Sequence, residues 1–391
     1  MAEIQIPEEY EGEEEIEILF DEDDNLVDPS LMDSDQQTEF NDNLAEFLDS
    51  STLSEISSQV LTNFQNDLDS REDWYETFKD GLELLGIQND PRSEPFEGAS
   101  GVYHPLLAEA VTHFQAQAYK ELLPANGPVD TKVMGASSDP KAMQANRVKD
   151  FMNYQLLYKM EEYDPEMDQM LFFLPLAGSA FKKCYFDPAI GRIVSRFIKA
   201  EDLVVPYSAT DLHTSPRITH RMSMTENDLL KLQLSGFYID TDMNAPMYGG
   251  DNDSVQSKID EIDGVTRTGD QHDFTLLECH TELDIEGFEH TDSEGEPTGL
   301  ALPYIVTVCK DTNDVLAIRR NYVETDPMRK KVEYFTHFKF LPGLGFYGFG
   351  LIHMIGGVTK SATAILRQLI DAGTLANLPA GFKARGLNIQ R

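Results

Sequence analysis

The stretch FKFLPGLGFYGFGLIHMIGG, residues 338–357, places six glycines among aromatic and aliphatic side chains. It runs directly into VTKSATAILRQL, a charged segment with helical spacing. Pro342, His353 and the glycines interrupt the apolar run, which argues against a membrane span. Because glycine permits close backbone approach and a sharp change of direction, we expect a structural junction that leads into a helix.

The sharpest periodicity in the chain begins at Leu351. Six apolar residues fall within about a third of the helical circumference at ~3.6 residues per turn: Leu351, Ile355, Val358, Ala362, Ile365 and Leu369. Polar side chains fall on the opposite side: Lys360, Thr363, Arg367, Asp371 and Thr374. We therefore predict a helix of about 28 residues that ends at Leu378, before Pro379.

Motifs that would carry chemistry are missing. In GGVTKS, Thr359 occupies the position directly before Lys360 where a phosphate-binding loop needs glycine. GASG at 98–101 is not the GxSxG nucleophile motif, and the nine histidines form no HExxH pattern and no Cys/His cluster. Two acidic stretches lack the glycine and glutamate of a calcium loop. We expect no enzyme activity, no cofactor and no metal site.

Charge is unevenly distributed along the 391 residues, which carry a net charge of -38. Residues 1–50 hold nineteen Asp and Glu and no Lys or Arg, whereas residues 329–391 hold nine basic residues against Glu333 and Asp371. Phosphates would be repelled by such an acidic outer surface, although a local basic contact near the C-terminal end stays possible. The hydrophobic content of 41% supports a sizeable core.

The N-terminal residues 1–48 combine like charges with few apolar clusters. We expect a disordered, solvated arm, or alternatively an acidic strip that docks on a basic partner. No basic region precedes a long apolar core, so no secretory signal is predicted. Three widely spaced cysteines, Cys184, Cys279 and Cys309, indicate a reducing cytoplasm rather than a disulfide framework.

Helical and strand-like segments alternate irregularly between these ends. Helices are predicted from Leu53 to near Gly81 or Gly86, over 107–122, and from Asp139, with Asp139 as cap, to about Tyr163. AFKKCYF and RIVSRFI flank a DPAIG turn and predict a hairpin, and four further strands are expected between 274 and 341. Thr225 and Gly236 bracket a short helix, and residues 240–273 are expected to form a long loop. The fold class is α+β, without a regular βαβ rhythm.

Three long segments resemble the portal proteins of tailed double-stranded DNA bacteriophages, in the branch related to short-tailed phages. They are EPFEGASGVYHPLLAEAVTHFQAQAYKELLP (94–124), LAGSAFKKCYFDPAIGRIVSRFIKAEDLVVPYSATDLHTSPRITHRM (176–222) and FKFLPGLGFYGFGLIHMIGGVTKSATAILRQLIDAGTLANLPAGFKARGL (338–387). With their spacing they cover most of residues 50–391. No catalytic signature carries the resemblance.

The resemblance implies a portal fold: a mixed α/β wing over 49–349, a stem helix over 350–378 and the start of a clip over 379–391. Such subunits form rings, usually of twelve copies, at one capsid vertex of the virion, and double-stranded DNA is packaged and ejected through the channel. The implied partners are further copies of the chain, the major capsid protein, terminase, and tail or head-tail adaptor proteins. Assembly in the host cytoplasm without a membrane is expected. A second stem helix, tunnel loop and crown are absent after Arg391, which suggests a truncated or split gene product.

The resemblance also assigns roles to particular residues. Gly343, Gly345, Gly348 and Gly350 would form the junction between wing and stem. Lys360, Arg367, Lys383 and Arg385 are candidates for phosphate or partner contact. Alternative interpretations are a scaffold or adaptor of virion assembly and, less favoured, a packaging-associated nuclease that would need clustered metal-binding carboxylates.

Overall fold

The computed structural model describes residues 39–86, 93–135, 138–187, 190–241, 258–259, 262, 273–291 and 296–377. The chain divides into two units, Met1–Glu39 and Phe40–Arg391. Every element below belongs to the second unit. Most of the predicted loop at 240–273 and the predicted clip at 379–391, with Lys383 and Arg385, lie outside the described residues.

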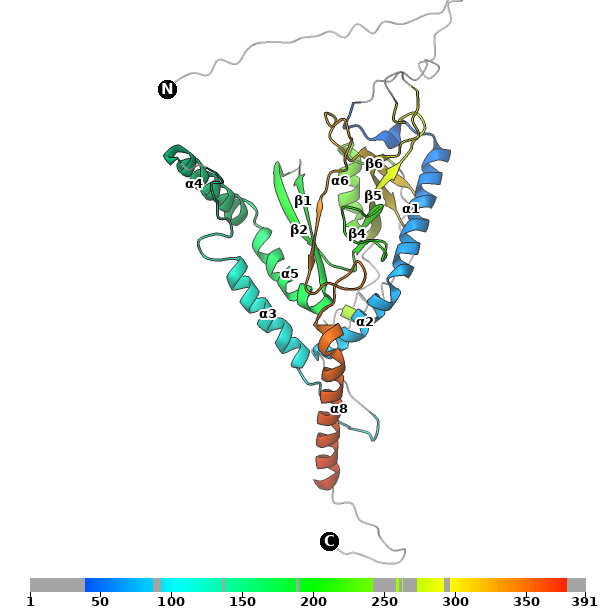
Figure 1. The fold of residues 1–391 in the computed structure, drawn as a ribbon. Helices are drawn as coiled ribbons and strands as arrows, with labels where there is room; N and C mark the ends of the chain where they lie inside the picture. The colour runs from blue at the N-terminus through cyan, green and yellow to red at the C-terminus, as the bar shows by residue number, and fades with distance from the viewer. Residues whose placement is uncertain are drawn as a thin grey trace, which may run out of the picture. The chain divides into compact units, whose positions relative to one another are not determined.

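The described helices and strands are shown in Figure 1. The helices are α1 (Ser50–Ser70), α2 (Glu72–Leu82), α3 (Leu106–Leu122), α4 (Asp139–Tyr154), α5 (Tyr163–Ala177), α6 (Glu226–Leu234) and α8 (Leu351–Asn377), with short turns η2 (Leu44–Glu46), η3 (Glu83–Leu85) and η4 (Gln155–Lys159). The strands are β1 (Ser179–Asp187), β2 (Arg192–Ile198), β3 (Leu203–Val204), β4 (Arg217–Thr225), β5 (Asp273–Leu283), β6 (Leu302–Cys309), β7 (Val315–Arg320) and β8 (Phe335–Lys339). This content confirms the α+β class.

Two antiparallel sheets organise the strands. One has the order β2-β1-β8 and the other has the order β3-β4-β5-β6-β7. The predicted hairpin is confirmed, because β1 and β2 pair in register from Phe181 with Ile198 to Asp187 with Arg192. The cap of α6 is confirmed as well, since the Thr225 side chain accepts a hydrogen bond from the Asp228 amide.

Helix ends differ from the predictions in three places. The first predicted helix breaks at Arg71 into α1 and α2: the Arg71 backbone leaves the helical region, and its side chain is buried in the core. The helix that begins at Asp139 ends in the π-helical turn η4, and α5 starts separately at Tyr163. Asp139 is not the cap: Ser138 is in the cap position and makes no side-chain bond.

Helix α5 differs from the sequence analysis, which predicts no helix between about Tyr163 and the hairpin. The proline lies in the last turn of α5, where it removes a single backbone bond. Gly178, with φ of 89°, then ends the helix in the left-handed region and leads into β1. A proline near a helix C-terminus is therefore tolerated here.

Two large hydrophobic clusters form much of the core. One lies between α2, α3, α5, the three-stranded sheet and the start of α8, and it includes Trp74, Phe78 and Phe181. The other lies between the five-stranded sheet, α1 and η2 and includes the fully buried Leu44. Residues 40–47, which the sequence assigns to the acidic arm, therefore lie in the body. Asn43 binds the edge of β7, donating to Leu316 O and accepting from Ile318 N.

Candidate interface formed by the α8 helix and its junction

The junction between β8 and α8 is a tight glycine-rich turn. A methyl group at Gly350 would overlap the carbonyl oxygen of Leu176, and one at Gly348 would overlap that of Gly178. The backbone therefore lies directly against the end of α5, which only glycine permits. Gly343 and Gly345 are also closely packed, against the Tyr347 carbonyl and the Tyr207 ring respectively.

A buried arginine ties this junction to the body. Arg71 is 1% exposed and donates hydrogen bonds to Ala200 O (2.7 Å), Leu203 O (3.2 Å), Glu201 O (2.6 Å) and Tyr347 Oη (2.8 Å). The Tyr347 hydroxyl in turn donates to Leu203 O at 2.9 Å. We call Arg71, Tyr347 and these carbonyls the Arg71 hub. It joins the α1–α2 break, the segment before β3 and the junction.

Sequence reasoning missed the hub, although one signal was present. Arg71 is the first basic residue after seventy without Lys or Arg, and Trp74 and Tyr75 follow it closely. The guanidinium lies 5.9 Å from the centroid of each of these two rings and 5.3 Å from that of Tyr347. An isolated cation beside aromatic residues is a pattern typical of cation–π stacking.

A buried carboxylate lies next to the hub. Glu201 is 2% exposed, and neither of its carboxylate oxygens has a hydrogen-bond partner among the described residues. Burial, reinforced by the neighbouring Asp202, raises the pKa of Glu201 to about 7. A group that changes charge near neutral pH therefore lies directly beside the hub.

The polar face of α8 is covered by the chain's own residues 98–104, which we call the strap. The Ser100 amide donates to Asp371 Oδ1 at 2.7 Å, and the His104 amide donates to Thr363 Oγ1 at 3.0 Å. Thr363 and Asp371 are buried as a result. Because the strap is irregular backbone, its amides need acceptors that a polar helix face supplies.

Arg367 belongs to the same contact. Its Nε donates to Val102 O at 2.8 Å, and its guanidinium lies 4.3 Å from the centroid of the Tyr103 ring. The structure therefore gives this candidate for phosphate contact a partner within its own chain. Lys360, the other described candidate on α8, is exposed to solvent.

The apolar face of α8 remains largely uncovered. Its exposed members define the α8 stripe: Met354, Val358, Ile365 and Leu369, with exposures from 54% to 70%. Ile352 on the other side is buried in the core with α2. Leu351 and Ile355 in the first turns pack against the core. Beyond them, the helix turns polar side chains to the strap and leaves the α8 stripe to solvent, unlike an ordinary surface helix.

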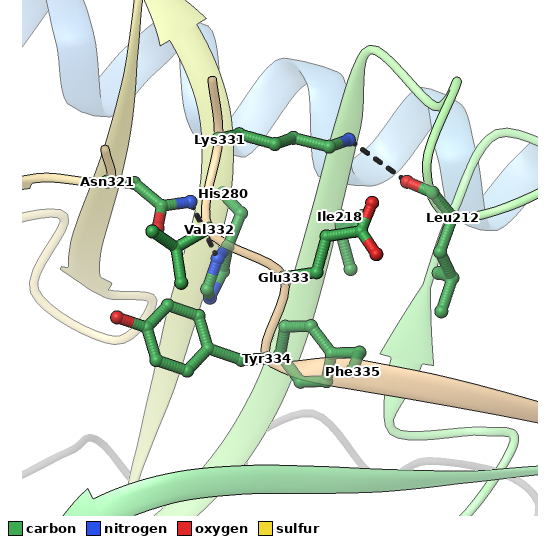
Figure 2. A pocket seen from close by; sticks show the side chains of 9 residues that line it. All are labelled: Leu212, Ile218, His280, Asn321, Lys331, Val332, Glu333, Tyr334 and Phe335. Atoms are coloured by element: carbon green, nitrogen blue, oxygen red, sulfur yellow. Dashed lines mark hydrogen bonds between the residues drawn. The ribbon is translucent and has the colours of Figure 1, made fainter. Parts of the chain in front are cut away.

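A small cavity lies between the two sheets (Figure 2). Its volume is about 10 Å³, enough for one water molecule, and its lining includes His280, Asn321 and Lys331. Beside it, Lys183 of β1 pairs with Glu278 of β5 at 2.5 Å. The cavity is too small for an organic substrate.

The titratable groups around this cavity form a structural network. His280 Nε2 lies 2.8 Å from Glu278 Oε1, and Lys331 Nζ donates to Leu212 O at 2.9 Å. Burial alone would raise the pKa of Glu278, but Lys183 and His280 lower it below its usual range. The ionised Glu278 carboxylate therefore links the two sheets through its ion pair with Lys183.

The described residues contain no group of three or more His, Cys, Asp or Glu side chains that is placed to hold a metal ion. Nor does the described part of the chain contain a helix whose length and apolarity would let it cross a membrane. A scan against protein-family models finds no match, and a search of the curated proteins finds none.

Proposed function

We propose that the chain is a structural portal subunit. In this proposal, copies assemble into a ring-shaped channel at a capsid vertex, and double-stranded DNA is packaged and ejected through it. Terminase and tail adaptors dock on the ring. The observation that supports the proposal best is α8, a 27-residue helix that leaves an α+β body through a glycine junction with an uncovered apolar stripe.

The α8 stripe supports assembly on physical grounds. Burial of a Val, Leu, Ile or Met side chain contributes about 1.5–3 kcal/mol relative to exposure, and the stripe holds four such residues. The strap occupies the opposite face, and no segment among the described residues covers the stripe. Neighbouring copies would bury it in a ring.

The charge distribution is consistent with a conduit for DNA. An acidic wall limits the affinity for phosphates, so DNA slides without being held, and a small number of cations steer it. The net charge of -38 is consistent with such a wall. Lys360 is the exposed α8 cation that we propose for the second role.

Electron microscopy of the negatively stained chain, with its mass in solution, tests the proposal. Rings with an open centre are expected, and the exchange Val358→Ser with Leu369→Ser is expected to reduce the ring fraction. Leu230→Ser with Leu234→Ser on α6, where both leucines are also exposed, is the matched control. A wild-type chain that stays monomeric at about 100 µM and low salt would contradict the proposal.

A further inference from the structure

Helix α4 and the turn η4 expose an aromatic and cationic face. Met143, Arg147, Phe151, Tyr154 and Tyr158 follow one another at steps of four, four, three and four residues, which places them on one side of the helix. The Tyr154 and Tyr158 rings stack at 5.9 Å. We call these five residues the arm surface. Lys159 lies beside it, 5.7 Å from the Tyr154 centroid.

The arm surface is unusually exposed for a folded helix. Met143 is 69% exposed, Phe151 61% and Tyr158 73%, and the only buried residue of α4 is Asn153. An isolated helix of this length is marginal in water, and large exposed apolar patches mark interaction surfaces. The arm surface is therefore suited to a partner.

Polar contacts on the other side hold α4 in place. Asn153 exchanges two hydrogen bonds with the backbone of Val129, and Lys149 pairs with Asp130 at 2.8 Å. These contacts leave the arm surface untouched. Its occupant must come from outside this part of the chain.

Electrostatics indicate the charge of that occupant. Residues 130–159 contain five Lys or Arg and three Asp, a net charge of +2 in a chain of net charge -38. Four of these cations are exposed and have no carboxylate partner among the described residues: Lys132, Lys141, Arg147 and Lys159. An acidic surface would complement them.

The chain itself carries such a surface on α2 and η3. Five exposed carboxylates share one side of these elements and form what we call the acidic ladder: Glu72, Asp73, Glu76, Asp80 and Glu83. Two lysines, Lys79 and Lys258, pair with members of the ladder and leave it acidic overall. At 1.5 Å per residue the ladder is about 17 Å long, close to the roughly 22 Å of the arm surface.

We infer that the arm surface of one copy docks on the acidic ladder of the next copy. The inference rests on the proposed function, because it specifies which surfaces join neighbouring subunits. In Figure 1, α4 lies at the outer end of the α3 and α5 pair, whereas α2 lies beside the start of α8. Two different surfaces in different parts of one body make a heterologous contact, which repeats head to tail and is the contact type that a ring with more than two subunits requires.

The chemistry of the two surfaces fits this contact. Arg147 offers a planar guanidinium that binds a carboxylate through two hydrogen bonds. The Tyr154 and Tyr158 hydroxyls can donate to further carboxylates, while Phe151 and Met143 pack on the methylene groups of the ladder. Tyrosine and arginine are residue types enriched in protein interfaces.

Charge reversal tests the contact. The arm variant carries Arg147→Glu and Lys159→Glu, and the ladder variant carries Glu76→Lys and Asp80→Lys. Each variant alone juxtaposes like charges, so its self-association constant, from light scattering at about 0.15 M ionic strength, is expected to fall at least tenfold. An equimolar mixture restores complementarity at both contacts and is expected to assemble as alternating copies.

A matched control changes the same amount of charge elsewhere. Lys231→Glu with Lys330→Glu alters two exposed lysines outside both surfaces and is expected to assemble like the wild type. Circular dichroism checks that all variants are folded. Assembly of both reversed variants at wild-type strength, or a mixture that remains dissociated, overturns the inference.

The outcomes separate this contact from the proposed function. Rings that persist in both reversed variants leave the portal proposal standing and overturn only the arm and ladder contact. A wild-type chain that shows no self-association at about 100 µM overturns both.

Discussion

The Arg71 hub and the arm surface use the same residue types in opposite ways. Each places an arginine among aromatic side chains, but Arg71 is 1% exposed whereas the arginine of the arm surface, Arg147, lies in solvent. Four acceptors surround the Arg71 guanidinium. Around Arg147 the described chain supplies none. The comparison teaches that neighbouring acceptors decide whether such a cluster stabilises the fold or is left for a partner.

Breaking the hub is expected to have the largest effect. Arg71→Met removes the donor that Arg71 supplies to Ala200 O and Glu201 O, together with its bonds to Leu203 O and the Tyr347 hydroxyl, and this costs about 3–5 kcal/mol in the free energy of unfolding. Urea denaturation measures the change. Arg147→Met is the control and is expected to stay within about 0.5 kcal/mol of the wild type. If both variants changed the free energy of unfolding by the same amount, the proposed difference between the buried hub and the exposed arm surface would be wrong.

The buried Glu201 carboxylate beside the hub is expected to make the stability of the protein depend on pH. The folded pKa of Glu201, about 7, lies above its unfolded value, so the folded state binds the proton more tightly. The stability that the protonated Glu201 contributes is fully present below about pH 4.5, and this contribution is lost as the pH rises through 7. Glu201→Gln is therefore expected to exceed the wild type in stability by about 2–3 kcal/mol at pH 8 and to match it near pH 5.

Urea denaturation at both pH values checks this prediction. Asp150→Asn on exposed α4 serves as a control, and no pH-dependent difference from the wild type is expected for it. A stability difference between Glu201→Gln and the wild type that is the same at pH 5 and pH 8 would show that Glu201 does not titrate in this range.

Removing a contact between the strap and α8 is expected to have an intermediate effect on the free energy of unfolding. Asp371→Ala leaves the partly buried Ser100 amide without its acceptor and costs about 1–2 kcal/mol. Hydrogen exchange should accelerate over residues 98–104 but not in β5. Unchanged exchange in the strap would mean that Asp371 does not hold it on α8.

The smallest effect on stability is expected on the arm surface. Phe151→Ser exchanges an exposed ring and should change the free energy of unfolding by less than about 0.5 kcal/mol, while it weakens self-association. Phe78→Ser, in the buried core near the hub, should cost about 3–5 kcal/mol. A large loss of stability in Phe151→Ser would place the arm surface in the fold rather than at an interface.

Much of the α8 region could be predicted, but its orientation could not. The helix was expected from Leu351 to Leu378 and is described over Leu351–Asn377, and the close packing of the four junction glycines agrees with the expected tight turn. Periodicity identifies an apolar side, yet it does not say which side meets the body. Arg367 and Thr363 lie more than 250 residues from their strap partners, a separation that no local pattern detects.

The sequence by itself determined the local features: the hairpin between β1 and β2, the Thr225 cap and the start of α8 at Leu351. These depend on turn chemistry and periodicity within a few residues. Only the tertiary structure decided that the chain breaks between α1 and α2 with Arg71 buried, and that Thr363 and Asp371 of α8 face inward. Both depend on acceptors and donors brought from distant segments, because a buried polar group is stable only where the folded chain supplies its partner.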